Sequence, residues 1–216
     1  MKPILMNNKV CIVGSGSCLR NSELGSKIDS FEHVIRFGGS ELHLERHKND
    51  VGTKTTELIH NSNYRALLNF KQRLIDHAQL YSEIQNLCIT HKGLKPKRRL
   101  LVENVITEYK KINNGTTRLL RTTNKYINFL KKNNCTLLKR KASYTSGLCL
   151  ILHSLQNFKK VYICGFDGLY VKMNNNQFCH FYGGNAKFNR YGHDINVEAN
   201  YIKEFIQKTN RVFELK

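Results

Sequence analysis

Two histidines, His180 and His193, are the residues of this chain best suited to proton transfer near neutral pH. His193 comes just before a stretch whose apolar spacing predicts a helix over residues 195–208. The positive end of that helix disfavours a charged imidazole, which suits a general base that accepts a proton from a hydroxyl group. A second histidine, if protonated, could donate to a phosphate on which negative charge develops. Taken alone, a histidine at a helix start is more often a cap or a surface residue.

Two turns rich in glycine and hydroxyl side chains could hold that phosphate. Gly14-Ser15-Gly16-Ser17 follows a short apolar run that reads as a buried strand. Its glycines would let backbone amides approach an anion, and the start of a following helix would add its positive end. Thr145-Ser146-Gly147 precedes an apolar helix and offers hydroxyls and amides in the same way, although a plain helix cap has the same pattern. The dinucleotide fingerprint needs a third glycine where this chain has Leu19, so an NAD-dependent oxidoreductase fits poorly.

Strands and helices alternate along the chain. The predicted strands are residues 9–13, 33–37, 57–60, 87–89 and 160–166. The predicted helices are residues 64–84, 102–138 with a break near 113–115, 148–155 and 195–208, and the predicted loops include 91–99 and 172–192. This alternation predicts an α/β fold with a mostly parallel sheet flanked by helices. Because no repeat or linker is evident, residues 1–216 are expected to form a single domain. Ligands of such sheets bind at the carboxyl ends of strands, where both turns would meet.

The chain is strongly basic, because lysines and arginines outnumber acidic residues by 35 to 16 and give a formal charge of +19. Such a charge favours anionic partners: nucleotide phosphates, an acidic membrane surface or nucleic acid. The basic run at residues 95–99 has no interleaved aromatic residues, and no helix-turn-helix, zinc-finger or RNP signature is evident. Nucleic acid is therefore the weakest of these partners.

The cysteines and the apolar runs bear on location. The seven cysteines are odd in number and include no Cys-x-x-Cys pair, so neither a zinc ribbon nor a disulfide framework is indicated. Free thiols fit a reducing compartment. No run of about 18 apolar residues occurs, so no transmembrane segment is expected.

Four stretches, taken in order, resemble the sialyl motifs of eukaryotic-type sialyltransferases (glycosyltransferase family 29). Residues 10–56, which include Gly14-Ser15-Gly16 and Asp50-Val51-Gly52-Thr53-Lys54, are similar to the long motif. Residues 144–166, with Ser146-Gly147, an apolar helix and Gly165-Phe166, are similar to the short motif. His180-Phe181-Tyr182 looks like the third motif, and His193 with Glu198 fits the very short motif His-x4-Glu.

The resemblance implies one GT-A-like, Rossmann-type domain and an inverting, metal-independent transfer of sialic acid from CMP-sialic acid to a hydroxyl of a glycan acceptor. On this family pattern His193 would be the general base, and His180 would assist the departing phosphate. Glu198 would orient neighbouring groups. CMP would be held by Ser15, Thr145, Ser146 and Gly147, with Ser17 on the same rim. No cofactor is expected, and the lack of an Asp-x-Asp sequence agrees with a metal-free monophosphate donor.

The chain also departs from the family pattern. Ser15 and Gly38 stand where the family has asparagines that contact the donor, so another CMP-activated acidic sugar, such as a Kdo-like one, is the alternative donor. From a different class, a basic nucleic-acid-binding protein is the alternative function. Val10 and Phe158 stand at the positions of the family's bridging cysteines, and no membrane anchor is evident. We therefore expect a protein of the cytoplasm, in a cell or in the cytosol of a virus-infected host, or one peripheral to membranes.

Overall fold

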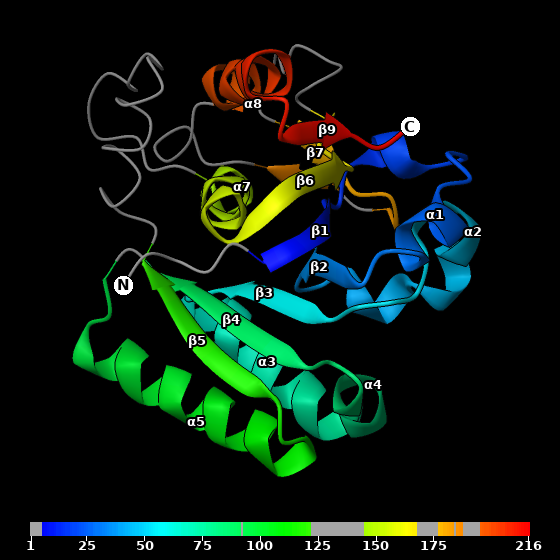
Figure 1. Ribbon diagram of the computed structural model, residues 1–216. Helices are drawn as coiled ribbons and strands as arrows, with labels where there is room; N and C mark the ends of the chain where they lie inside the picture. The colour runs from blue at the N-terminus through cyan, green and yellow to red at the C-terminus, as the bar shows by residue number, and fades with distance from the viewer. Residues whose placement is uncertain (1–5, 92, 122–144, 168–176, 184, 188–194) are drawn as a thin grey trace.

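The computed structural model describes residues 6–91, 93–121, 145–167, 177–183, 185–187 and 195–216. Its centre is a seven-stranded parallel sheet in the order β5-β4-β3-β2-β1-β6-β9 (Figure 1). The strands are β1 (Met6–Val13), β2 (His33–Phe37), β3 (Glu57–Asn61), β4 (Asn86–His91), β5 (Thr116–Arg121), β6 (Phe158–Cys164) and β9 (Val212–Glu214). A separate antiparallel pair is formed by β7 (Gln177–Cys179) and β8 (Asn185–Lys187).

Helices cover both faces of the sheet. The α-helices of the described residues are α1 (Gly25–Asp29), α2 (Lys48–Val51), α3 (Tyr64–Asp76), α4 (Ala78–Ser82), α5 (Pro96–Ile112), α7 (Ser146–Asn157) and α8 (Ile195–Thr209). Three short 3-10 helices are η1 (Ser17–Leu19), η2 (Glu41–His43) and η3 (Glu45–His47). The α/β fold with a parallel sheet flanked by helices, expected from the sequence, is therefore confirmed.

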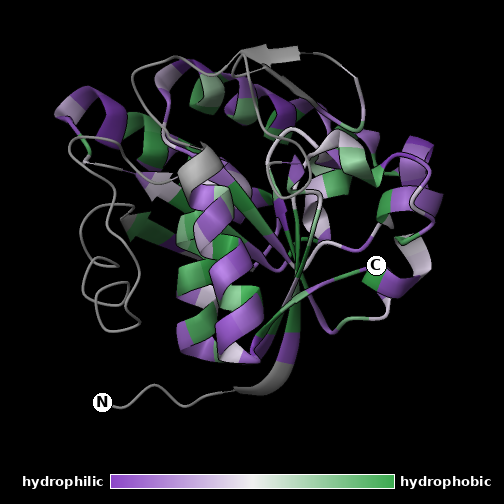
Figure 2. Ribbon diagram, turned by 90° about the horizontal axis from the view of Figure 1, so that it is seen from above, coloured by the Kyte–Doolittle hydropathy of each residue, from purple (hydrophilic) through white to green (hydrophobic). Residues whose placement is uncertain are grey.

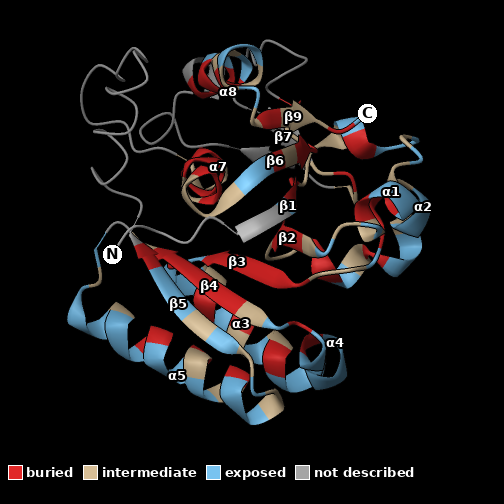
Figure 3. Ribbon diagram, in the orientation of Figure 1, coloured by how far each residue is buried: buried red, intermediate tan, exposed pale blue. Residues whose placement is uncertain are grey.

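Successive residues of a strand point to opposite faces of the sheet, and each face has its own apolar core. Val10 and Ile12 of β1 belong to the core beneath α7 and α8, whereas Cys11 and Val13 pack toward α1 and α2. On that second face α3, α4 and α5 cover β3 and β4 (Figure 1). Burial on both faces, visible along β3 and β4 in Figure 3, explains the apolar runs at residues 10–13 of β1, 58–59 of β3 and 87–89 of β4.

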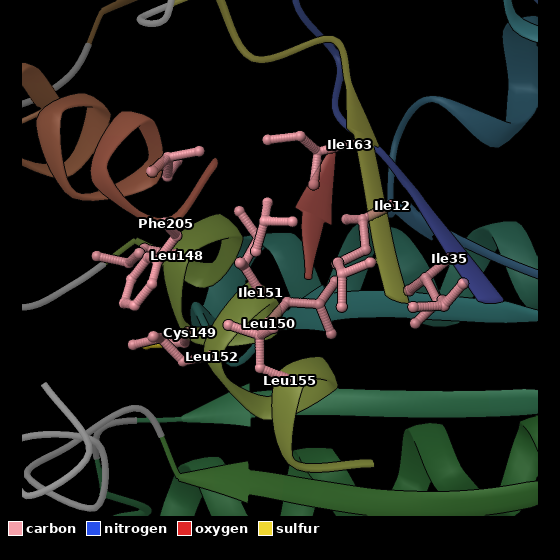
Figure 4. Close-up of a cluster of buried hydrophobic side chains, with 14 of the residues drawn as sticks. Ile12, Ile35, Leu148, Cys149, Leu150, Ile151, Leu152, Leu155, Ile163 and Phe205 are labelled. Atoms are coloured by element: carbon pink, nitrogen blue, oxygen red, sulfur yellow. The ribbon is translucent and has the colours of Figure 1, made fainter. Parts of the chain in front are cut away.

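The helix α7 lies under α8 and is apolar almost throughout because it is buried on most sides. Its N-cap is Thr145, whose hydroxyl accepts a hydrogen bond from the Leu148 amide at 3.2 Å. Leu148, Ile151 and Leu155 pack in one cluster with Phe205 of α8 (Figure 4). The outer helices instead carry both hydrophilic and hydrophobic residues, as the hydropathy colours of Figure 2 show.

The strand order reverses at β1, which positions the site. From β1 the chain adds β2, β3, β4 and β5 on one side, then returns through α7 to add β6 on the other side. Two turns therefore leave neighbouring strands in opposite directions at the carboxyl ends of β1 and β6. This is the place where open parallel sheets bind their ligands.

The predicted elements agree with the structure in part. The strand predicted at residues 33–37 matches β2, and the helix predicted at 195–208 matches α8 to within one residue. Four predictions are wrong, the first because the loop expected at residues 172–192 contains the strands β7 and β8. The helix expected at residues 64–84 is two helices, because α3 ends at Asp76 and α4 begins at Ala78. The loop expected at residues 91–99 is helical from Pro96 onward, where α5 begins. Residues 116–121, expected to continue a helix, form the strand β5. β9 was also missed.

Two further expectations concern the chain as a whole. None of the helices in the described part of the chain combines the length and apolarity needed to cross a bilayer. The assignment of residues 1–216 to a single domain stays a prediction.

Candidate functional site

Two glycines lie back to back where β1 and β6 end. The Gly14 amide donates a hydrogen bond to the Cys164 carbonyl oxygen at 2.8 Å. A Cβ on Gly14 would lie 2.2 Å from the Gly165 carbonyl oxygen, and Gly165 itself has a φ of +74°. Larger residues do not fit at either position. The turn after β1 and the turn after β6 are thus fixed against each other.

The carboxylate of Asp167 fills the turn after β1. It accepts hydrogen bonds from the Ser17 amide at 2.8 Å, the Ser17 hydroxyl at 3.0 Å and the Cys18 amide at 2.9 Å. The Gly16 amide donates to the Gly165 carbonyl oxygen at 2.9 Å. The turn also continues into the three-residue 3-10 helix η1 and not into an α-helix. The amides of Gly16, Ser17 and Cys18 therefore already have acceptors within the protein, and the expected anion site at this turn stays a prediction.

The segment that carries His180 lies along the same turn. The Phe181 amide donates to the Ser15 carbonyl oxygen at 2.9 Å, and His180 pairs with Gly16 in a β-bridge. Arg20 holds the segment further by donating to the carbonyl oxygens of His180 and Phe181 at 2.7 and 3.0 Å. The structure thus brings His180 next to Ser15, whose hydroxyl has no hydrogen-bond partner among the described residues.

Partial burial lowers the pKa of His180 below its ordinary value, although a hydrogen bond to the Ser15 backbone and the charge of Asp167 oppose this effect. His180 is therefore neutral at pH 7 when no ligand is present. A phosphate beside the ring would raise the pKa, because a nearby negative charge favours imidazolium. The protonated His180 expected from the sequence thus requires a bound anion.

Three aromatic rings stack beside this turn. The rings of His180 and Tyr182 are 4.8 Å apart between centroids and 9° from parallel, and those of Tyr182 and His43 are 4.4 Å apart and 14° from parallel. His43 comes from η2, far away in the sequence. The third motif therefore packs against the segment that follows β2.

The start of α7 is anchored by Glu198 of α8. The buried Glu198 carboxylate accepts hydrogen bonds from the Thr145 amide at 2.7 Å and from the Thr145 hydroxyl. The same hydroxyl caps α7, so both roles of Thr145 serve the helix end. This geometry agrees with the interpretation of Glu198 as an orienting residue.

Ser146 and Gly147 form the half-buried beginning of the same helix. The Ser146 hydroxyl lies 3.1 Å from the Thr90 hydroxyl at the end of β4, and a Cβ on Gly147 would lie 3.0 Å from the ring of Phe166. The amides of Ser146 and Gly147 have no hydrogen-bond partner within the described residues. A helix start with free amides favours an anion, so α7 offers what the turn after β1 does not.

Gly38 follows β2, and the space that a side chain at this position would occupy is filled by the ring of His60 from the next strand. A Cβ on Gly38 would lie 2.4 Å from Cδ2 of His60, the fourth residue of β3. Nδ1 of His60 donates to the Asn61 carbonyl oxygen at 2.9 Å, and the ring stacks on Phe70 at 4.4 Å. Burial lowers the pKa of His60 to about 4, so the ring is neutral.

A buried carboxylate fixes the segment after Gly38. Glu41 is 2% exposed, accepts a hydrogen bond from the Tyr81 hydroxyl at 2.8 Å and accepts another from the Gly39 amide. Arg73 lies 3.4 Å from the same carboxylate and 3.4 Å from Nε2 of His60. The loop between β2 and η2 is thus held from several directions.

Other residues of the long motif hold the fold. Arg36 is fully buried and donates to the carbonyl oxygens of Lys54 and Val51 at 2.9 and 2.6 Å. Asp29 accepts hydrogen bonds from the amides of Thr53 and Lys54 at 2.9 to 3.0 Å. These contacts close the segment between α1 and β3 on the face away from α7.

Three further sequence predictions concern the general base, a metal site and the positions of the family's cysteines. His193, the predicted general base, lies outside the described residues. No cluster of side chains suited to a metal ion occurs among the described residues. Val10 and Phe158, at the family's cysteine positions, both pack into the core beneath α7.

The sequence reasoning missed Asp167, Glu41 and His43. Asp167 follows the Gly-Phe pair at the end of a predicted strand, a position that faces ligands in parallel sheets, and this signal could have identified it. Glu41 and His43 had no comparable signal, because their partners are distant in the chain.

Comparisons with known proteins agree with this geometry. The family model described as glycosyltransferase family 29 (sialyltransferase) matches residues 6–210. Beta-galactoside alpha-2,6-sialyltransferase 1 of Mus musculus is 37% identical over 76 residues, which span 35% of this chain and 17% of the mouse enzyme. The matched segment is thus a small part of that relative.

Solved structures share the fold over nearly the whole chain. The crystal structure of a mammalian sialyltransferase in complex with Gal-beta-1-3GalNAc-ortho-nitrophenol matches with a TM-score of 0.60 and 15% identity, over 97% of this chain and 69% of that one. A second crystal structure of a mammalian sialyltransferase matches with a TM-score of 0.58 and 16% identity over the same shares. Since the family model covers nearly the entire sequence, the chain belongs to glycosyltransferase family 29, the sialyltransferases.

Proposed function

We propose that this chain is an inverting glycosyltransferase that moves sialic acid from CMP-sialic acid to a hydroxyl group of a glycan acceptor. The observation that carries the proposal is the match to the sialyltransferase family from residue 6 to residue 210. The geometry supports it, because Ser15, His180 and the start of α7 all border the carboxyl edge at the strand-order reversal.

The donor phosphate is proposed to bind at the start of α7. The amides of Ser146 and Gly147 extend from a helix end whose partial positive charge favours an anion. The Thr145 hydroxyl donates to Glu198 and is therefore already occupied, so Thr145 and Glu198 are proposed to orient the helix end that binds CMP. The hydroxyl of Ser15, which has no hydrogen-bond partner in the described part of the chain, is a further proposed donor to the phosphate.

His193 is the proposed general base and His180 the proposed proton donor to the departing phosphate. Loss of a general base costs about 10²–10⁴-fold in rate, so His193→Ala should lose most transfer. CMP affinity should stay nearly unchanged in that variant, because a base acts in the transition state. Transfer within a few-fold of wild type would remove His193 from the mechanism. Transfer is proposed to need no metal and should persist in excess EDTA.

The named relatives suggest which acceptor to test first. The mouse relative is named for a β-galactoside, and one solved structure contains Gal-beta-1-3GalNAc-ortho-nitrophenol. We therefore propose a galactose-containing glycan as the acceptor class. Because Gly38 offers no side chain where the family has asparagine, CMP-Kdo is the alternative donor to set beside CMP-sialic acid.

A ligand series tests the class of the protein. Thermal denaturation with CMP, UMP, GMP and NAD should show a rise in Tm with CMP, since a ligand at 100 times its Kd stabilises the folded state by about 2.7 kcal/mol. A shift with NAD and none with CMP would reject the proposal. DNA binding that falls steeply with salt and is not displaced by CMP would favour the nucleic-acid alternative.

The cytosolic or membrane-peripheral location stays a proposal as well. It rests on the apolar residues Val10 and Phe158 at the family's cysteine positions. A Tm that falls strongly under reductant would oppose it.

A further inference from the structure

We propose that His43 is a positioning residue that orients the ring of His180 through Tyr182. The inference rests on the proposed function of His180 as a proton donor to the donor phosphate. It concerns a histidine that lies outside the third motif, in η2. Its basis is the stack of three rings from two distant segments.

Tyr182 joins the two imidazoles. Its ring is 14° from parallel with His43 and 9° from parallel with His180, at centroid distances of 4.4 and 4.8 Å. Tyr182 also meets Phe181 edge to face at 5.1 Å and 86°. These contacts restrict the plane of the tyrosine ring, and the tyrosine ring in turn restricts the plane of His180.

His43 is suited to this role because its own backbone is fixed. It belongs to the same 3-10 turn as Glu41, whose buried carboxylate is bound by the Gly39 amide, the Tyr81 hydroxyl and Arg73. The turn can therefore shift only if this buried polar network also breaks. His43 thus gives Tyr182 a rigid surface.

The orientation of His180 needs such support. The backbone of residues 180–182 is held by Ser15 and Arg20, but these bonds act on the main chain and not on the His180 ring. The ring lies beside the Ser15 backbone, which favours its charged form, and this contact alone does not fix the ring plane. Proton donation requires a ring nitrogen to face the phosphate oxygen within hydrogen-bond distance, so the ring plane decides the rate.

The ionisable groups near the stack are compatible with two neutral imidazoles in the free protein. Glu41, Arg46, His47 and Arg73 face His43, and Asp167 faces His180. Burial keeps both imidazoles neutral in the free protein, so the stack forms without repulsion between two cations. When a bound phosphate raises the pKa of His180 and the ring takes up a proton from solvent, the face of Tyr182 also favours the imidazolium.

Three variants of the full chain test the inference. His43→Ala removes the outer ring, His43→Phe restores an aromatic surface without a titrating group, and His47→Ala is the matched control. His47 comes from the next 3-10 turn and contacts Phe181 edge to face at 5.4 Å, so its loss removes a ring contact with the third motif but leaves the stack of His43, Tyr182 and His180 intact.

We expect His43→Ala to lower kcat about 3- to 10-fold, the value of one aromatic pair, with donor KM changed less than about twofold. His43→Phe should recover most of the rate, and His47→Ala should leave kcat near that of wild type. NMR titration of His180 should show a changed pKa and ring chemical shift in His43→Ala only. If His43→Ala does not fold, His43→Leu takes its place.

The outcomes separate the two proposals. If wild type has no transfer activity, the proposed function fails while the NMR comparison still tests the stack. If wild type is active and His43→Ala matches His47→Ala in both kcat and the His180 titration, His43 is not a positioning residue.

Discussion

Placing the family's asparagine at position 38 is predicted to destabilise this protein. In Gly38→Asn the new Cβ would lie 2.4 Å from Cδ2 of His60, a distance that real Cβ atoms do not show. The Gly38 amide bonds to the Ile59 carbonyl oxygen at 2.8 Å, so the backbone resists moving away. Either the His60 ring or the end of β2 must shift.

The His60 ring has little freedom to shift. It is 5% exposed, stacks on Phe70 at 4.4 Å and donates to the Asn61 carbonyl oxygen at 2.9 Å. Overpacking of a core costs about 1–3 kcal/mol, and each lost hydrogen bond about 0.5–1.5 kcal/mol. We therefore expect Gly38→Asn to lower the free energy of unfolding by about 2–4 kcal/mol.

A double-mutant cycle measured by urea denaturation checks this reasoning. His60→Ala removes the ring and is destabilising by itself, but in that background the cost of Gly38→Asn should fall below about 0.5 kcal/mol, because the two residues interact directly. Gly38→Ala should show most of the loss, since the clash begins at Cβ. Gly93→Ala is the control, because a Cβ there meets nothing within 4 Å.

Two results would refute the account. Equal costs of Gly38→Asn in the wild-type and His60→Ala backgrounds would mean that the ring does not fill the space. A Gly38→Ala variant as stable as Gly93→Ala would mean that the backbone absorbs the clash. If the cycle behaves as expected, the activity of Gly38→Asn/His60→Ala with CMP-sialic acid and CMP-Kdo becomes the natural next comparison.

Three further predictions use single residues. Glu198→Gln should lower the free energy of unfolding by about 1–3 kcal/mol and weaken CMP binding, because one buried hydrogen bond to Thr145 is lost. Glu204→Gln on the same helix is the control and should be nearly neutral, because its ion pair is exposed. Chemical denaturation and CMP titration measure both effects. Asp167→Asn should cost about 1–3 kcal/mol in the same denaturation assay, because an amide has one acceptor oxygen for the three donors at the turn. Burial lowers the pKa of His60 in the folded protein to about 4, so on acidification the unfolded chain binds a proton before the folded protein does. The free energy of unfolding should therefore fall by up to about 3 kcal/mol between pH 7 and pH 4, and the urea midpoint of His60→Leu should depend less on pH. Equal pH profiles for wild type and His60→Leu would contradict this prediction.

The sequence predicted the central strands well because their signal is local. Residues 33–37 include the apolar residues Val34, Ile35 and Phe37, as expected for a strand buried on both faces, and they form β2 without any change of bounds. β5 was missed because Thr116–Arg121 mixes polar and apolar residues, and its pairing with β4 decides its structure. The break between α3 and α4 at His77 also lacks a glycine or proline signal.

The sequence predicted where in the fold the site lies, but not which residues contact one another there. The turn after β1, the start of α7 and His180 do lie at one edge of the sheet, as the alternation of strands and helices implied. The sequence did not show that Asp167, about 150 residues away, accepts hydrogen bonds from amides of the first turn. A glycine-rich turn shows where backbone amides can be approached, but it does not show which group approaches them.

The departures from the family pattern become interpretable once the neighbours in space are known. Gly38 reads in the sequence as the loss of a donor-binding side chain, yet His60 from the adjacent strand fills the same volume. Val10 and Phe158 likewise share one apolar core where the family has a pair of cysteines. In both cases side chains of this chain fill the space, as close packing requires of a stable fold. A departure of this kind therefore argues for a rebuilt edge of the site rather than for a lost one, and the Gly38–His60 cycle measures that difference directly.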